Sequence, residues 1–281
     1  MNIRYFAFAL AALTLLFSKV LFDLGRFALQ SDTFSHIILI PPIVAYLASL
    51  RWKTAIQDFR PSQLATMIPL ALGVMALTAN WLFARAPETR LCLYTLSYVC
   101  FVIAAAFRFL GVATVRELVF PFALLFFMLP LPPVVMDGLE IFFQHTSALA
   151  AAAMIKVSGL PAVRDGLLLF LPGFTIEVAQ ECSGIRSTLV LFITSLIAGY
   201  LLLRQPRDRA ILAISIIPLA ILRNGFRIFS LAWLSVEVNP DILDSALHHR
   251  GGPIFFALSL IPLFLLLLLL RRLEKKQAYA S

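Results

Sequence analysis

Charged residues are scarce in this sequence, where Asp, Glu, Lys and Arg together make up 14% of 281 residues. Soluble globular chains carry about 25% charged residues, so this composition excludes an ordinary soluble domain. Hydrophobic residues instead make up 61% of the chain. They gather in repeated runs of roughly twenty residues, the length that an α-helix needs to cross a bilayer. The sequence therefore predicts an all-α polytopic membrane protein.

Cysteine and histidine are equally rare, with three and four residues respectively. Three cysteines without paired spacing exclude a disulfide framework and a cysteine-based zinc site. Cys92 and Cys100 lie within an apolar run and are interpreted as packing residues. The adjacent histidines His248 and His249 have no Cys or Glu cluster beside them to complete a metal site. We therefore expect no metal and no other cofactor.

Basic residues outnumber acidic ones by 23 to 15, but they occupy short loops between apolar runs. This placement favours the lipid bilayer over nucleic acid as a partner. The positive-inside rule places the basic clusters at residues 204–209 and 271–276 in the cytoplasm. With these clusters as anchors, we expect eight transmembrane helices, both termini in the cytoplasm, and Cys182 and His248 on the outer face of the cytoplasmic membrane.

The predicted spans divide a single membrane domain into three parts. Residues 1–137 hold five spans, at about 5–24, 37–50, 64–83, 91–107 and 118–135, and the first is interpreted as an uncleaved helix rather than a signal peptide. The four prolines of the fifth span predict a kinked or unwound outer end. Residues 138–183 form an outer-face insert, with an amphipathic or re-entrant helix at 139–155 and a short β-hairpin around Pro172 and Gly173. Residues 184–281 hold three spans, at about 184–203, 210–236 and 253–270.

A short polar island, residues 181–187, lies between two apolar regions and contains Cys182. This cysteine precedes a predicted helix, whose free N–H groups and dipole favour an anion, and Arg186 adds a positive charge one turn later. Both effects favour the thiolate, which is a competent nucleophile. We therefore interpret Cys182 as a nucleophile at a membrane surface.

Two further polar motifs are predicted to lie at the same membrane level. Arg223 and Arg227 share one face of an apolar helix beside Asn224, and guanidinium groups in such a place face a polar cavity or a counter-charge. His248 precedes the last span, and a neutral imidazole can exchange a proton with a thiol or with a leaving amine. The predicted topology brings Cys182, Arg227 and His248 to the outer face.

These motifs resemble those of the exosortase and archaeosortase family of membrane cysteine transpeptidases. The likeness rests on three motifs in order and on a weaker early loop: Glu181-Cys182-Ser183-Gly184-Ile185-Arg186-Ser187, Asn224-x-x-Arg227-Ile228, His248-x-x-x-Gly252, and Asp32-x-x-Ser35-His36 before Pro41-Pro42. It covers essentially the whole chain. The resemblance implies an eight-span fold and catalytic roles for Cys182, Arg227 and His248.

The resemblance also implies the substrate. Family members cleave C-terminal sorting signals of exported proteins, in which a short motif, Pro-Glu-Pro in the bacterial group, precedes an apolar span and a basic tail. The activity is linked to exopolysaccharide or surface-protein export. Cleavage through a thioester implies an amine acceptor or water as the second reactant.

Roles for individual residues follow from this resemblance. Arg227 is expected to hold the substrate carbonyl or to stabilise the oxyanion, and His248 to act first as a general acid and then as a base. His249 or Arg250 in place of His248 stays open as the group that faces the thiol. Arg223 is expected to receive the acidic residue of the sorting motif. The supporting residues are Glu181, Ser183, Gly184, Arg186, Arg223, Asn224, His249, Arg250, Asp32 and His36.

Two other functions also fit a basic multi-span chain. A transporter or flippase uses intramembrane arginines to pass an anionic lipid or sugar, although such sites lie near the bilayer midplane in broken helices. A non-enzymatic assembly component of polysaccharide secretion is the second alternative. Both predict that loss of Cys182 has little effect, and this separates them from a cysteine enzyme.

Overall fold

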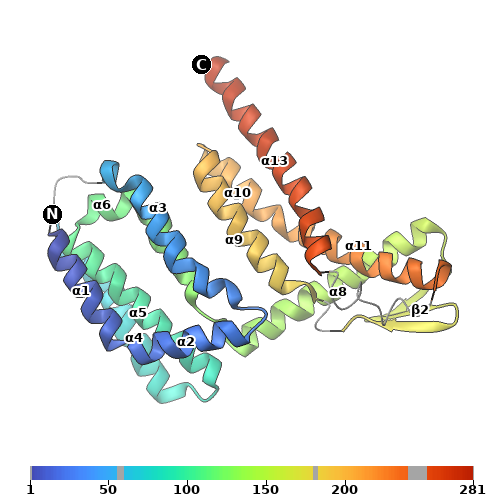
Figure 1. The fold of residues 1–281 in the computed structure, drawn as a ribbon, viewed down its shortest axis with the longest axis horizontal. Helices are drawn as coiled ribbons and strands as arrows, with labels where there is room; N and C mark the ends of the chain where they lie inside the picture. The colour runs from blue at the N-terminus through green and yellow to red at the C-terminus, as the bar shows by residue number, and fades with distance from the viewer. Residues whose placement is uncertain (1, 56–59, 180–182, 240–251, 281) are drawn as a thin grey trace. The chain divides into compact units, whose positions relative to one another are not determined.

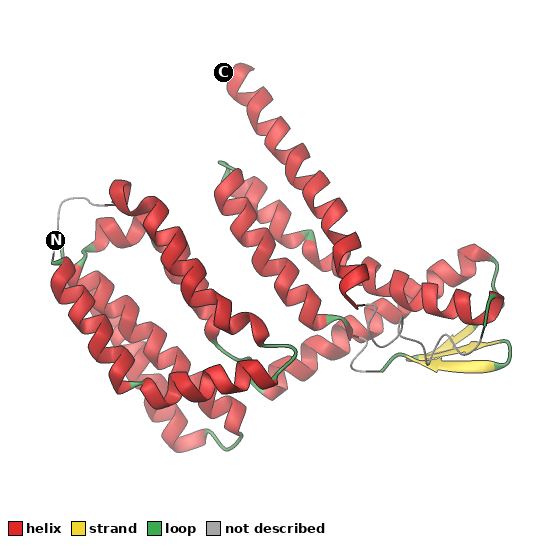
Figure 2. Ribbon diagram, viewed as in Figure 1, coloured by secondary structure: helices red, strands yellow, loops and turns green. Residues whose placement is uncertain are grey.

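The computed structural model describes residues 2–55, 60–179, 183–239 and 252–280. Within these ranges the chain is mainly helical, with one small three-stranded sheet (Figure 2). It divides into two compact units, Met1–Met136 and Asp137–Ser281. Five predicted site residues lie outside the described residues: Glu181, Cys182, His248, His249 and Arg250.

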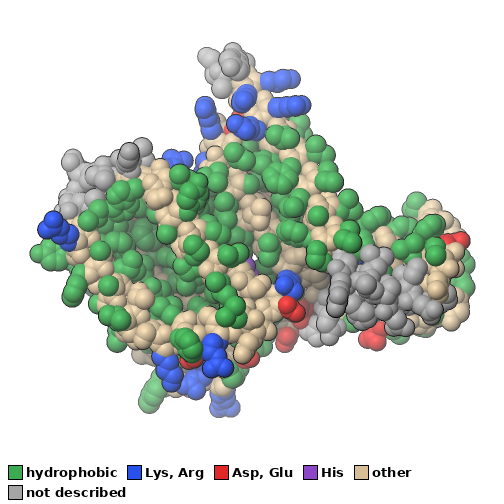
Figure 3. All heavy atoms as spheres, in the orientation of Figure 1, with side chains coloured by type: hydrophobic (Ala, Val, Ile, Leu, Met, Phe, Trp, Pro, Cys, Tyr) green, Lys and Arg blue, Asp and Glu red, His purple; other side chains and the backbone are tan. Residues whose placement is uncertain are grey.

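The helices have the length and composition of membrane spans. Six helices in the described ranges are long and apolar enough to cross a membrane, and the number rises to eight if each of two bent pairs is one span. On the face drawn in Figure 3, apolar side chains cover the helices, and Lys and Arg side chains gather near the C-terminal end of α13 (Gly252–Ala280). The prediction of an all-α polytopic membrane protein is confirmed, whereas the count of eight spans stays a prediction.

The first unit consists of helices throughout its described residues (Figure 1). The Ser97 hydroxyl donates a 2.8 Å hydrogen bond to the Gly73 carbonyl, so small residues bring the two longest helices of the unit close together. In chain order the elements are α1 (Ile3–Leu16), α2 (Ser18–Gln30), η1 (Ser35–Leu39), α3 (Ile40–Ala55), α4 (Gln63–Phe83), α5 (Pro87–Phe109), α6 (Val112–Glu117), α7 (Val119–Leu124) and η2 (Leu125–Met128).

The predicted first span is a bent pair of helices rather than one helix. The chain bends by 69° between α1 and α2, at Phe17. The Phe17 ring is buried against Tyr98 and Phe101 of α5. The next turn carries Lys19 and Asp23, which are exposed. The bend keeps the Phe17 ring buried in the first unit and leaves the polar side of α2 exposed.

The predicted fifth span is broken near its end, as its prolines predict, and its helical part ends at Met128. The chain then bends by 94° into α8 (Pro133–Ser158). Pro130, Pro132 and Pro133 explain the break, since proline lacks a backbone N–H and disfavours the helical conformation of the residue before it. α8 therefore begins earlier and runs further than the insert helix predicted at residues 139–155.

The second unit combines long helices with the sheet. β2 pairs with both β1 and β3 in antiparallel register, and Pro172 and Gly173 join β2 to β3. Gly173 has a φ of +88°, which glycine adopts without strain. The elements after α8 are β1 (Val163–Asp165), β2 (Leu168–Leu171), β3 (Phe174–Glu177), α9 (Ile185–Leu202), α10 (Pro206–Ile214), α11 (Ile216–Glu237) and α13.

Buried apolar side chains join the sheet to two helices. Leu169 and Leu171 of β2 point to the buried face, because alternate residues of a strand face opposite sides. They form a core with residues of α8 and α11: Ala148, Ala151, Ile155, Ile228 and Ala232. The sheet is therefore attached to α8 and to α11, the helix that carries Arg223 and Arg227.

The last helix is tied to the turn between α9 and α10. The Glu274 carboxylate of α13 accepts hydrogen bonds from the backbone N–H groups of Arg204, at 2.9 Å, and Gln205, at 2.7 Å. Leu263 of α13 and Leu191 of α9 belong to one buried cluster. Polar and apolar contacts together hold α9, α10 and α13 against one another.

Candidate functional site

The first turn of α9 is built around the Gly184 carbonyl. Gly184 is the N-cap residue of this helix, directly after the buried Ser183. Its carbonyl oxygen accepts hydrogen bonds from the Thr188 backbone N–H at 3.0 Å, the Thr188 hydroxyl at 2.9 Å and the Ser187 hydroxyl at 3.0 Å. These bonds hold the chain two residues after Cys182 in one conformation.

Arg223 of α11 contacts the same carbonyl. Its Nη2 atom donates to the Gly184 carbonyl oxygen at 3.0 Å and to the Thr188 hydroxyl at 3.4 Å. The side chain is only 8% exposed, and its Nη1 atom is buried with no hydrogen-bond partner among the described residues. Part of the guanidinium group therefore holds α9 against α11, and the other part has hydrogen-bonding capacity left.

Gly184 cannot be replaced by a larger residue without displacing its neighbours. Its φ is +71°, in the region that residues with a side chain rarely adopt. A Cβ atom there would lie 2.8 Å from Arg223 Nη2 and 3.2 Å from the Asn224 side-chain oxygen. Asn224 itself is 2% exposed. The glycine thus permits both the backbone turn and the close approach of two polar side chains from α11.

A second small residue brings α11 close to α8. A Cβ atom on Gly225 would lie 2.7 Å from the Ala150 Cβ atom and 3.2 Å from the Ala151 nitrogen. Arg227, half-buried, follows Arg223 by one helical turn and therefore lies on the same side of α11. The next residue, Ile228, belongs to the core beneath the sheet.

The chain that enters the polar island is held at its other end by α8. The Gln144 amide nitrogen donates a hydrogen bond to the Val178 carbonyl oxygen. The Val178 N–H donates to the Leu167 carbonyl oxygen at 3.0 Å, and the Val178 side chain is buried. Val178, bonded to Gln144 of α8, and Gly184, bonded to Arg223 of α11, are thus the held residues on either side of residues 179–183 in the sequence.

Comparison with known protein families shows which family the chain belongs to. The model of the family described as transmembrane exosortase (Exosortase_EpsH) matches residues 28–265. The chain belongs to the transmembrane exosortase family. The matched range includes the cysteine, arginine and histidine motifs and residues of both compact units. No curated protein and no solved structure matches the chain.

In this exosortase the structure brings together part of the predicted site. Gly184, Arg223 and Asn224 are in contact, and Arg227 follows on the same helix. Arg186 is exposed on the first turn of α9. Five predicted residues lie outside the described ranges, so their roles stay predictions: Glu181, Cys182, His248, His249 and Arg250.

The early-loop residues belong to the first unit. Asp32 is exposed, whereas His36 is buried in η1 with its Nδ1 atom 3.2 Å from the Thr33 carbonyl oxygen. His36 thus has a local structural contact, and a role for either residue in chemistry stays a prediction. Among the described residues, no group of three or more His, Cys, Asp or Glu side chains is placed to hold a metal ion.

Two residues that hold this site were missed in the sequence. Thr188 follows Gly184 by one helical turn, and a hydroxyl at that spacing can return a hydrogen bond to the first free carbonyl of the helix. Gln144 recurs with Glu140 on the polar side of α8. That polar side was interpreted as a membrane-surface face, and the sequence contains no signal for its bond to Val178.

Proposed function

We propose that this exosortase is a membrane cysteine transpeptidase or protease that cleaves C-terminal sorting signals of exported proteins. The observation that carries the proposal is the anchoring of the cysteine segment, with Val178 bonded to Gln144 and Gly184 bonded to Arg223. Catalysis requires a nucleophile held in one place relative to the groups that assist it. Val178 and Gly184, which flank the cysteine segment in the sequence, are both held by such bonds, and this supports Cys182 as the nucleophile.

In the proposed reaction the Cys182 thiolate attacks the carbonyl carbon of the scissile peptide bond. The tetrahedral intermediate collapses to a thioester as the C–N bond breaks, and His248 gives its proton to the leaving amine. His249 and Arg250 are the alternatives for this position. An amine acceptor or water then attacks the thioester and loses a proton to the same imidazole. The thiolate leaves as the new amide or acid forms, so every proton is returned.

The arginines have separate roles in this proposal. Arg227 stabilises the oxyanion that forms on the carbonyl oxygen, because a positive group aimed at developing charge acts only in the transition state. Arg223 positions the first turn of α9 through its Nη2 bond to Gly184. Its buried Nη1 atom is the group that would receive the acidic residue of the sorting motif. Glu181, Ser183 and Arg186 orient the cysteine segment.

The proposed substrates are exported proteins that end in a short motif, an apolar span and a basic tail. Such a protein crosses the bilayer beside the enzyme and presents its motif just outside the cytoplasmic membrane, where we place the active site. The basic tail stays in the cytoplasm by the same charge rule that orients the enzyme. We connect this activity to export of exopolysaccharide or of surface proteins.

Cleavage of a natural candidate in membranes tests this function directly. Proteins encoded in the same genome that end in a motif, a span and a basic tail are tagged on both sides of the motif and produced with the enzyme. We expect the two tags to separate only when the enzyme is present and the motif is intact. If every such candidate kept both tags in membranes that contain the folded enzyme, the proposal would be wrong.

Replacing Gly184 by alanine tests the anchoring step. Alanine at a positive φ costs about 1–2 kcal/mol of stability, and its Cβ atom also displaces Arg223 or Asn224. Displacement of a reacting group by about 1 Å can cost up to about 10²-fold in rate. We therefore expect a loss of processing of that order with a modest decrease in thermal stability.

Gly166→Ala is the matched control for this substitution. Gly166 also has a positive φ, +58°, but a Cβ atom there would meet nothing within 4 Å. Both variants carry the backbone strain, and only Gly184→Ala disturbs the arginine. Equal processing by the two variants would show that the contact between α9 and α11 does not position the nucleophile.

A further inference from the structure

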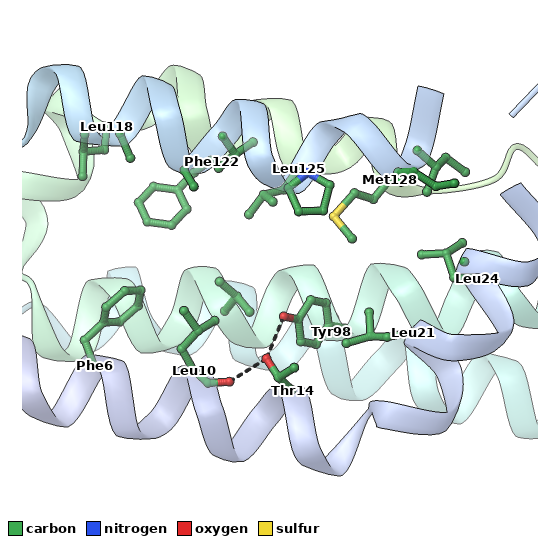
Figure 4. A pocket seen from close by; sticks show the side chains of 18 of the residues that line it. Phe6, Leu10, Thr14, Leu21, Leu24, Tyr98, Leu118, Phe122, Leu125 and Met128 are labelled. Carbon is green, nitrogen blue, oxygen red and sulfur yellow. Dashed lines mark hydrogen bonds between the residues drawn. The ribbon is translucent and has the colours of Figure 1, made fainter. Parts of the chain in front are cut away.

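The first unit contains an apolar cavity of about 620 Å³ that the proposed chemistry does not use. In Figure 4, Phe6 and Leu118 lie at one end of it and Leu24 and Met128 at the other. Its lining comes from α1, α2, η1, α3, α5, α7 and η2, with two residues, Leu110 and Leu118, from the links before and after α6. Among the residues that the structure describes, no charged side chain lines it. The cavity therefore selects an apolar molecule.

The two hydroxyl groups in its wall, those of Thr14 and Tyr98, already have hydrogen-bond partners. The Thr14 hydroxyl lies 3.2 Å from the Tyr98 hydroxyl and donates to the Leu10 carbonyl at 2.8 Å (Figure 4). Water needs two or more polar partners in a cavity, so apolar walls of this kind do not hold it. An empty cavity is also unfavourable, and its cost rises with its volume. In a bilayer these apolar walls therefore favour an apolar occupant over water.

Its size excludes a helix and fits a lipid chain. A transmembrane helix about 10 Å across and about 30 Å long occupies roughly 2,400 Å³, several times the volume of the cavity. Sites of about 300–1,000 Å³ are typical for one small molecule. Because the walls belong to membrane helices, the molecules that reach them come from the bilayer. The occupant of this size and polarity is an alkyl or isoprenoid chain of a membrane lipid.

One end of the cavity is strongly basic. Phe6, Trp52 and Leu110 pack in one cluster there, with Leu118 at the same end. Each of these four residues lies within two positions of an exposed arginine: Arg4, Arg51, Arg108 and Arg116 respectively. The other end, near Leu24, has acidic as well as basic neighbours in Asp23 and Arg26. Basic pockets beside membrane helices bind anionic head groups.

Because the apolar cavity lies beside four arginines, we propose that the first unit binds one anionic membrane lipid. The acyl chain occupies the cavity, and the phosphate of the head group lies among the arginines at the Trp52 end. The positive-inside rule accounts for arginines in a loop between membrane spans, but it does not account for an apolar cavity beside them. The site is separate from the cysteine chemistry, so it can be tested without any processing assay.

Filling the cavity tests whether a chain is held there. Ala48 lines the cavity on α3, and phenylalanine at this position takes up part of its volume. Ala71→Phe on the exposed side of α4, outside the cavity, is the control. We expect the purified full chain and Ala71→Phe to retain one phosphatidylglycerol per chain by native mass spectrometry, and Ala48→Phe to lose at least about tenfold of it.

Gly25→Leu provides a second filling variant if Ala48→Phe does not fold. Gly25 lines the same cavity, a Cβ atom there meets nothing within 4 Å, and removing glycine from a helix favours folding. Loss of the retained lipid in this variant supports the site. Retention equal to that of the unchanged chain in a folded filling variant would overturn it.

Tryptophan quenching tests the head group. Trp52 lines the cavity, whereas Trp81 is 86% exposed on α4 and reports lipid that surrounds the protein. The experiment uses phosphatidylcholine vesicles that contain either brominated phosphatidylglycerol or brominated phosphatidylcholine as the quencher. In a variant that keeps only Trp52, the brominated phosphatidylglycerol should quench the fluorescence at a lipid fraction at least about fivefold lower than the brominated phosphatidylcholine. One arginine contact with an anionic head group supplies a preference of this size. A variant that keeps only Trp81 should respond equally to both. Equal responses of Trp52 to both lipids would identify surrounding lipid only and overturn the proposal.

Discussion

Replacing Cys182 by alanine is expected to lower processing of the sorting signal by about 10⁴-fold or more, as removal of a catalytic nucleophile does in other covalent enzymes. Without the thiol no thioester forms, and the remaining groups can only polarise the peptide bond. The variant should still accumulate in membranes, because one small side chain is changed. The measurement is separation of the two tags of a candidate substrate over time, with enzyme amount determined in the same membranes.

Cys100→Ala is the matched control for this experiment. Cys92 and Cys100 are both buried in α5, so neither is accessible to a substrate. The control should process normally, and a thiol alkylator should inactivate it as it inactivates the unchanged enzyme. A transporter or an assembly component would keep its activity without Cys182. Normal processing by Cys182→Ala would therefore remove this residue from the mechanism.

The fold was predictable where hydrophobicity alone decides it. Long apolar runs have one stable form inside a bilayer, and α4, α5 and α9 follow the predicted spans closely. α13 begins at the predicted last span but runs on to Ala280. The bends were harder to predict. At Phe17 no proline or glycine signals a break, and the 69° turn depends on an aromatic pocket formed by Tyr98 and Phe101 of another helix. Tertiary contacts of that kind have no signature in a local pattern.

In the candidate site, too, local spacing was predictable from the sequence and tertiary contacts were not. Helical spacing predicts that Arg223 and Arg227 share a face, because residues four apart are neighbours on a helix. It does not predict what that face meets. Arg223 was assigned to a substrate carboxylate, and the structure gives one of its nitrogens a partner inside the protein, the Gly184 carbonyl. The glycine carries the missing signal, since its positive φ and lack of a Cβ atom are what allow this contact.

Replacing Arg227 by alanine is expected to lower the turnover rate by about 10²–10³-fold, the usual cost of removing one oxyanion-stabilising group. The KM should change little, because the full negative charge on the carbonyl oxygen exists only in the transition state. Arg227→Lys keeps a positive charge but loses the planar guanidinium group, so it should restore only part of the rate. Arg271→Ala, at an exposed position of α13, is the control and should process normally.

Whether the loss of Arg227 changes the turnover rate or the KM distinguishes two roles for this residue. If it binds the acidic residue of the sorting motif in the ground state, its loss raises the KM and leaves the maximal rate nearly intact. Changing Pro-Glu-Pro to Pro-Gln-Pro in the substrate then lowers kcat/KM with the unchanged enzyme but has little further effect with Arg227→Ala. If it stabilises the oxyanion, the two changes act on different steps and their effects on kcat/KM multiply. Multiplicative effects support the assignment of Arg227 to the oxyanion and leave Arg223, with its buried Nη1 atom, as the partner of the acidic residue.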